Sequence, residues 1–340
     1  MARPIRPPTK RIRVARYAKR YGHAPITWQR ALRAIDWNTE ARLLKATEET
    51  SVWRVPVRLP GNMTVGVVKC QRLTVKRRVQ SLLRASRAHR QWDGARRLLR
   101  AGIPAARPMV ILQTKGRSKP IETLFLQNLN GPTLLEYLAR EHATMLETRR
   151  MDAAVIHAVA TLLRRMQKAR LYNRDGKPSN LVLTRLDATP GEEAAEIAVV
   201  DTVAIERRRW TREALVRALA DLYTEPLGCD CAPSNRACMR LLVELAPREG
   251  RKRRHALFRD VRREVLSRGD PTPKDNPLAA AEADPDAPPL VPRRPSGAEL
   301  RVMGRSIAAV RARAAAQAAL STPPSPSAGS PEASPAEPAG

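Results

Sequence analysis

The spacing of hydrophobic residues changes along this chain, and that change limits the possible folds more than any other feature. Within residues 52–59 apolar residues alternate with basic residues or proline: Trp53, Val55, Val57 and Leu59 against Arg54, Pro56 and Arg58. A period of two is typical of a half-buried β-strand. Between residues 133 and 169 the apolar residues have helical spacing: Val155, Val159, Leu162, Leu163 and Met166. A β-rich first half followed by a helical second half predicts an α+β fold with two lobes.

The same pattern predicts the order of the elements. A short amphipathic helical pattern covers 27–45, and a hairpin pairs 52–59 with 64–69 across the turn at 60–62. An arginine-rich helix covers 76–101 and ends before Gly102, where a C-terminal cap is expected. The remaining elements are strands at 109–113 and 123–127, helices over 133–169 divided near 144, a hairpin of 181–184 with 197–201, and helices at 211–225 and 235–268.

Composition suggests how the chain is divided. We predict a basic disordered arm at 1–25, an N-lobe at 26–130 and a C-lobe at 131–268. Residues 269–340 are rich in Pro, Ala and Ser, which predicts a disordered tail, with a helix over 297–320 as the exception.

Charge is distributed unevenly. The formal net charge is +29, whereas residues 271–340 carry seven basic and seven acidic residues. The excess therefore belongs to the first 270 residues and indicates an anionic partner, such as a nucleotide, a phosphorylated sugar, a lipid headgroup or nucleic acid.

Cysteines and apolar runs indicate the cellular context. The four cysteines are too few and too clustered for a secreted disulfide framework. Cys229, Cys231 and Cys238 have no fourth ligand nearby in sequence, so free thiols are favoured over a zinc site. No apolar run approaches the ~20 residues that cross a bilayer, and the basic N-terminus lacks the apolar region of a signal peptide. We expect a cytoplasmic protein, with peripheral contact at the inner face of the cytoplasmic membrane as one possibility.

A polar loop carries the strongest chemical signal. The segment NRDGKPSN (173–180) follows a buried helix, and an apolar strand then ends in Asp201. Phosphoryl transfer needs an acceptor for a hydroxyl proton, a cation for the moving phosphoryl group and oxygen ligands for Mg²⁺. Asp175 is the candidate catalytic base and Lys177 the cation. Asn180 and Asp201 are the candidate Mg²⁺ ligands, and Lys69 at a strand end is suited to nucleotide phosphates.

Several motifs of this chain resemble those of a known enzyme family. NRDGKPSN is similar to the catalytic loop of protein-kinase-like enzymes, VGVVK (65–69) to their lysine-bearing strand, and VVDTV (199–203) to their Asp-Phe-Gly segment. Residues 86–104 (SRAHRQWDGARRLLRAGIP) resemble the lipopolysaccharide core kinases. Over residues 40–268 the resemblance implies a two-lobed protein-kinase-like fold that uses ATP and Mg²⁺. It also implies transfer of the γ-phosphate to a hydroxyl of a 3-deoxy-manno-octulosonic acid (Kdo) or heptose sugar on a lipid.

The sequence departs from the kinase pattern at four places. Asn173 replaces the usual His, Thr202 and Val203 replace Phe-Gly, and Gln91 lies where a Glu should face Lys69. Asp93 could replace that Glu, but it points to another face of the helix. No G-x-G-x-x-G is present, and the candidate phosphate-covering turn at 47–51 contains no glycine.

Two alternatives therefore stay open. Gln91 and the absent glycine loop are compatible with a pseudokinase or scaffold on the same fold. The net charge and the basic arm with Tyr17 and Tyr21 are compatible with nucleic-acid binding, although aromatic residues for stacking are few and no usual recognition motif is present.

Overall fold

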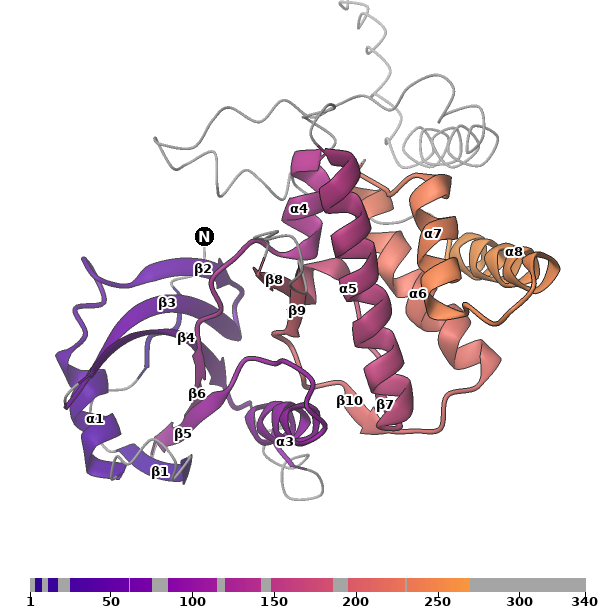
Figure 1. Cartoon of the computed structure of the whole chain (residues 1–340). Helices are drawn as coiled ribbons and strands as arrows, with labels where there is room; N and C mark the ends of the chain where they lie inside the picture. Colours follow the sequence, from indigo (N-terminus) through magenta and orange to yellow (C-terminus); the bar gives the residue numbers. More distant parts are fainter. Residues whose placement is uncertain are drawn as a thin grey trace, which may run out of the picture. The chain divides into compact units, whose positions relative to one another are not determined.

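The computed structural model in Figure 1 describes residues 4–7, 12–17, 25–60, 62–74, 85–114, 120–141, 148–185, 195–229 and 231–269. The predicted tail after residue 269, including the helix expected at 297–320, lies outside the described residues.

The first half of the chain forms one antiparallel sheet of six strands, in the order β1-β5-β6-β4-β3-β2. Its strands are β1 (Ile12–Tyr17), β2 (Arg42–Ala46), β3 (Thr50–Leu59), β4 (Asn62–Arg72), β5 (Pro108–Thr114) and β6 (Ile121–Gln127). The predicted hairpin is present as β3 and β4, with Val52 opposite Lys69.

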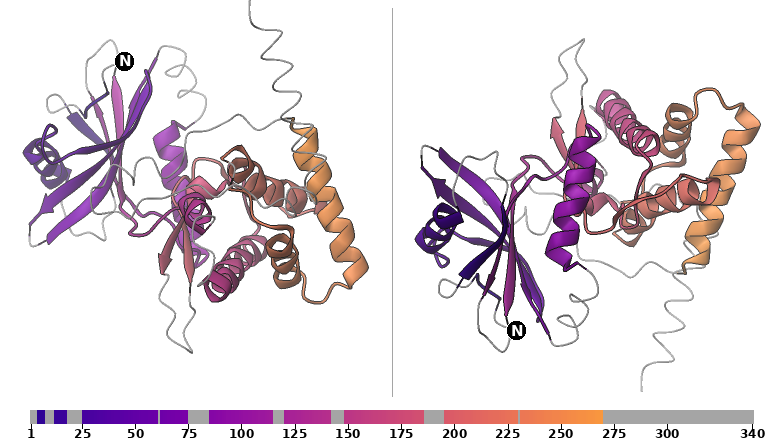
Figure 2. Two further views of the ribbon diagram at one scale, coloured as in Figure 1. Left: turned by 90° about the horizontal axis from the view of Figure 1, so that it is seen from above. Right: turned by 90° about the horizontal axis from the view of Figure 1, so that it is seen from below.

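Two helices cover opposite faces of this sheet, α1 (Pro25–Ala34) and α3 (Arg87–Arg100), as Figure 2 shows. Trp28 of α1 packs with Phe125 of β6, their ring centroids 6.4 Å apart. Trp92 of α3 instead packs in a cluster with Leu124 and Leu126, the residues on either side of Phe125. Side chains also alternate along β4. Lys69 therefore points toward α3, whereas its neighbours Val68 and Cys70 belong to the hydrophobic cluster on the α1 side of the sheet.

The second half is mainly helical. Its elements are α4 (Leu134–Glu141), α5 (Thr148–Lys168), β7 (Leu171–Asn173), a single 3₁₀ turn (Pro178–Asn180), β8 (Leu181–Arg185), β9 (Glu196–Val199), β10 (Ile205–Arg207), α6 (Arg212–Gly228), α7 (Asn235–Leu245) and α8 (Arg251–Ser267). Apolar side chains of α5, α6, β8 and β9 share one core, to which Leu98 of α3 also belongs. Helix α8 lies on the side of this part that is farthest from the sheet (Figures 1 and 2). The predicted fold class, α+β with a β-rich N-lobe and a helical C-lobe, is confirmed.

The prediction of a disordered arm over 1–25 needs correction at residues 12–17, which form strand β1 on the edge of β5. The sequence alone could not show this strand, because β1 is stabilised by the elements that pack against it in the folded protein. Arg16 pairs with Asp93 at 2.8 Å and lies over the Trp92 ring. Asp93 is thereby directed toward β1 and does not replace the missing Glu.

Three helix boundaries also differ from the prediction. The pattern at 27–45 is helical only to Ala34, and residues 42–46 pair with β3 as an edge strand. The helix expected over 235–268 is two helices, separated by the turn at 246–250. Of the helix expected at 76–101, the described part begins at Arg87, and residues 75–84 lie outside the described residues.

Candidate active site

Strand β4 brings Lys69 against helix α3 and the end of β9. Its Nζ lies 3.3 Å from Oε1 of Gln91 and 3.7 Å from Oδ2 of Asp201. Only 26% of the Lys69 side chain is exposed. Burial lowers the pKa of Lys69, and the charge of Asp201 opposes that effect. The expected meeting of Lys69 with Asp201 is therefore present in the structure.

Gln91 has two partners, which explains why an amide suits this position. Its Oε1 accepts from Lys69, while its Nε2 donates to the carbonyl oxygen of Val200 at 3.1 Å. A carboxylate has no donor for that carbonyl. The residue is 2% exposed, so an unpaired polar group here would be costly.

Helix α3 is held close to the segment that carries Asp201. The Thr202 hydroxyl donates to the main-chain oxygen of Gln91 at 2.6 Å. A Cβ on Gly94 would lie 1.9 Å from the carbonyl oxygen of Thr202, so only glycine permits this approach. At the start of the helix, Ser86 accepts from the His89 amide and donates to the buried carboxylate of Glu122 on β6. These contacts fix where the helix places Gln91.

Asp201 is surrounded by cations. Besides Lys69, Arg87 from the first turn of α3 approaches Oδ2 of Asp201 at 3.5 Å. Burial by itself would raise the pKa of Asp201, but Lys69, the Val203 amide, Arg87 and Lys177 together hold that pKa below its ordinary value. The carboxylate is thus kept ionised, as a cation ligand must be. Sequence reasoning missed Arg87, although its position four residues before Gln91 places it on the same face of the helix.

The polar loop after β7 presents Asp175, Lys177 and Asn180 together. Nδ2 of Asn180 donates to the main-chain oxygen of Asp175 at 2.9 Å and to its Oδ2 at 3.0 Å. Nζ of Lys177 lies 3.4 Å from Oδ1 of Asp175. Because the amide nitrogen of Asn180 is committed to Asp175, its carbonyl oxygen is the atom suited to a metal.

Two further contacts hold this loop in place. Asn173, in the position of the usual His, accepts from the amide of Asp175 at 3.0 Å and so supports the backbone of the loop. The buried Glu225 of α6 accepts from the amide and hydroxyl of Ser179, both at 2.8 Å. The sequence analysis did not identify Glu225, whose one local signal is a carboxylate among the mostly apolar residues at the end of α6.

The loop and the Asp201 segment are neighbours. The amide of Val200 donates to the main-chain oxygen of Asn180 at 3.0 Å, next to the pairing of Leu181 with Val199. Asn180, just before β8, and Asp201, two residues after β9, therefore lie at the same end of these paired strands. Their donor set of amide and carboxylate oxygens fits a hard cation such as Mg²⁺.

Comparison with known proteins now identifies the family. A sequence model of the Lipopolysaccharide kinase (Kdo/WaaP) family matches residues 67–238, half of the chain and the stretch that holds all six site residues. The chain belongs to this family. It is accordingly a kinase-type phosphotransferase.

The structural comparison agrees with this fold. A solved structure described as "WaaP in complex with acyl carrier protein" aligns with a TM-score of 0.50 at 19% identity, covering 76% of this chain and 98% of that one. At this identity the likeness concerns the fold. A search of curated proteins finds no matching relative.

Two smaller observations complete the description. None of the four cysteines, all of which lie among the described residues, forms a disulfide. Among the described residues, no helix combines the length and hydropathy required to cross a bilayer.

Proposed function

We propose that this kinase transfers the γ-phosphate of ATP, with Mg²⁺, to a hydroxyl of a lipopolysaccharide-type sugar of the Kdo or heptose class. The observation that carries the proposal is the meeting of Lys69, Gln91 and Asp201, next to a loop that presents Asp175 and Asn180.

Each residue has a distinct role in this proposal. Lys69 binds the α- and β-phosphates, and Gln91 positions its ammonium group. Asn180 and Asp201 hold Mg²⁺, which when bound supplies charge neutralisation at the phosphates. Asp175 accepts the proton of the acceptor hydroxyl, and Lys177 offsets negative charge that develops on the moving phosphoryl group.

Asn180 supports the proposed base as well as the metal. Its amide donates to Oδ2 of Asp175, which orients the carboxylate and leaves the ion-paired Oδ1 near Lys177. Positioning and charge neutralisation would thus supply most of the rate enhancement, as is general for phosphoryl transfer.

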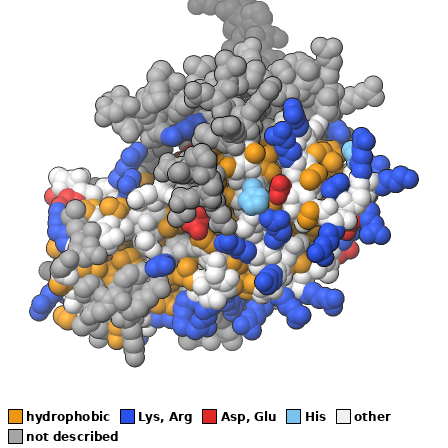
Figure 3. Space-filling model, in the orientation of Figure 1, with side chains coloured by type: hydrophobic (Ala, Val, Ile, Leu, Met, Phe, Trp, Pro, Cys, Tyr) orange, Lys and Arg blue, Asp and Glu red, His pale blue; other side chains and the backbone are white. Residues whose placement is uncertain are grey.

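The family and the charge support the acceptor class. Figure 3 shows Lys and Arg side chains spread over this face of the molecule, where acidic side chains are few. Such a surface suits an anionic sugar-lipid at the inner face of the cytoplasmic membrane, where basic residues are attracted to anionic headgroups.

The test is phosphate transfer from radiolabelled ATP to Kdo- or heptose-bearing acceptors by purified protein. We expect Asp175→Asn to reduce kcat by about 10³-fold or more, because general-base catalysis contributes 10²–10⁴-fold. Its thermal unfolding should match that of the wild type. Turnover by Asp175→Asn close to the wild-type rate would contradict the assignment of the base.

The alternatives give different results in the same preparation. A pseudokinase would show an ATP-dependent thermal shift with no transfer to any acceptor. A nucleic-acid-binding protein would show salt-dependent retention of RNA or DNA and no thermal shift with ATP.

A further inference from the structure

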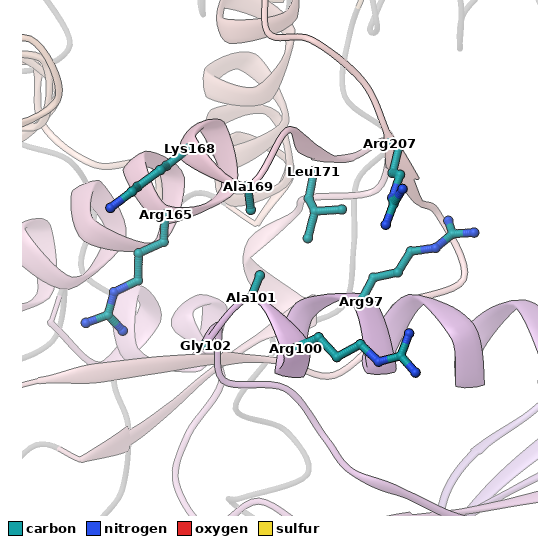
Figure 4. Close-up of a pocket in the computed structure, with 9 residues that line it drawn as sticks. All are labelled: Arg97, Arg100, Ala101, Gly102, Arg165, Lys168, Ala169, Leu171 and Arg207. Atoms are coloured by element: carbon teal, nitrogen blue, oxygen red, sulfur yellow. The ribbon is translucent and has the colours of Figure 1, made fainter.

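A cavity lies at the C-terminal end of helix α3. It has a volume of about 620 Å³, within the range of small-ligand sites. Nine residues line it: Arg97, Arg100, Ala101, Gly102, Arg165, Lys168, Ala169, Leu171 and Arg207. Five carry cationic side chains and, among these nine residues, none is acidic. Figure 4 shows small and apolar residues in the middle of the cavity, with the cationic side chains around them.

Three separate elements supply these cations. Arg97 and Arg100 come from the last turn of α3, and Arg165 and Lys168 from the last turn of α5. Arg207 comes from β10, where it lies opposite Leu171 of β7, another lining residue. The neighbouring carboxylate of Glu206 pairs with Arg174 and Arg208.

Helix dipoles explain part of this arrangement. Basic residues in the last turn of a helix interact favourably with its C-terminus. This interaction explains why each of the four cations on α3 and α5 is found at its own helix end. The helix dipole does not explain why two helix ends meet at one cavity, or why Arg207 of β10 lies there as well. Cations gathered around one cavity repel one another, and an anion bound among them would remove that repulsion.

This cavity is distinct from the candidate active site. Arg100 follows Gln91 by nine residues, which corresponds to about 13 Å along the axis and to the opposite face of the helix. Arg97 is directed to the β10 side, where it donates to the carbonyl oxygen of Ile205 at 3.2 Å.

We propose that this cavity, the α3–α5 pocket, binds an anion that carries several phosphate groups. Guanidinium groups suit phosphate because their planar donors form paired hydrogen bonds. Four arginines and a lysine on several sides of one cavity match a ligand with more than one phosphate. Such a ligand is either a phosphorylated lipid headgroup or a free polyphosphate. This inference does not depend on the function proposed above.

The experiment measures binding of inorganic tripolyphosphate to the full chain by calorimetry in metal-free buffer. The test variant is Arg100→Ala/Arg207→Ala, and both of these residues are exposed. We expect about tenfold weaker binding or more, because each lost charged hydrogen bond reduces affinity. The matched control is Arg96→Ala/Arg209→Ala, which removes the same charge from exposed neighbours outside the pocket and should change affinity by no more than about twofold.

Two more measurements make the outcome decisive. Lys69→Ala tests whether the signal belongs to the active site. If the test variant does not fold, Arg100→Ala and Lys168→Ala are measured singly. No binding by the wild type, equal loss in the control pair, or loss in Lys69→Ala alone would overturn the proposal.

Vesicles distinguish the two sources. Phosphatidylcholine vesicles are compared with and without phosphatidic acid. Co-sedimentation that needs phosphatidic acid and weakens in Arg100→Ala/Arg207→Ala indicates a lipid headgroup. Tripolyphosphate binding without this difference indicates a free polyphosphate.

Discussion

The two ends of helix α3 differ in how their charges are balanced. At the first end, Arg87 and Lys69 share the carboxylate of Asp201, and only 17% of that side chain is exposed. At the last end, Arg97 and Arg100 meet further cations from α5 and β10 around an open cavity. At the first end a carboxylate of the fold lies between the cations, whereas at the last end the residues that line the cavity include no carboxylate.

This difference shows what each end is suited to do. Contacts at the first end fix distances between groups, which catalysis requires. The last end carries the exposed side chains of Arg97 and Arg100, and exposed positive charge suits recognition of a mobile anion. The same helix can therefore position the proposed catalytic residues and also contribute to a separate binding surface.

The largest effect is expected from a Gly→Ala substitution in the middle of α3, compared with the same substitution just beyond its last turn. Gly94→Ala would place a Cβ 1.9 Å from the carbonyl oxygen of Thr202 and push the helix from the Asp201 segment. We expect a loss of about 3 kcal/mol in the free energy of unfolding, together with loss of transfer activity.

Gly102→Ala is the matched control for that substitution. Gly102 has a φ of 70° and nothing within 4 Å of the added Cβ, so its cost should be only about 1 kcal/mol from backbone strain. Urea denaturation measures both variants. Equal losses at the two positions would contradict the view that α3 is tightly packed where it meets the Asp201 segment.

A smaller effect is expected from Gln91→Glu. The carboxylate would lose the hydrogen bond to the carbonyl of Val200 and face that oxygen directly. We expect about 1–2 kcal/mol lower stability at neutral pH, measured by urea denaturation. Unchanged or higher stability would show that an ion pair with Lys69 compensates, and that the amide is not required.

The smallest expected effect is on the pH dependence of folding stability. The pKa of Asp201 is held below its ordinary value in the folded state, so its ionised form favours folding. That contribution is complete above the unfolded pKa of about 4 and is lost as pH falls below it. Asp201→Asn should therefore lose less stability than the wild type on acidification, as thermal unfolding between neutral and acidic pH would measure.

The α3–α5 pocket provides the contrast for this experiment. Guanidinium groups stay protonated across that range, so the curve of Arg100→Ala/Arg207→Ala should run parallel to that of the wild type. If Asp201→Asn also ran parallel, the stabilising role of the ionised carboxylate would be wrong.

Patterns within short segments predicted much of this molecule. The alternation at 52–59, the loop at 173–180 and the apolar strand before Asp201 predicted the sheet, the hairpin and the polar loop that the structure contains. These features depend on side-chain spacing along one segment, which the sequence displays directly. Within the predicted arm, residues 12–17 were predicted wrongly because that strand is stabilised by β5 and by Arg16 against Trp92.

The sequence by itself determined the β-rich first half, the helical second half and the chemical groups of the polar loop. Only the tertiary structure decided the partners of those groups. Gln91 contacts Val200 across 109 positions, and Ser179 contacts Glu225 across 46. The α3–α5 pocket likewise joins residues from 97 to 207. Such contacts depend on how whole elements pack together, and the spacing of residues within any one element carries no record of that packing.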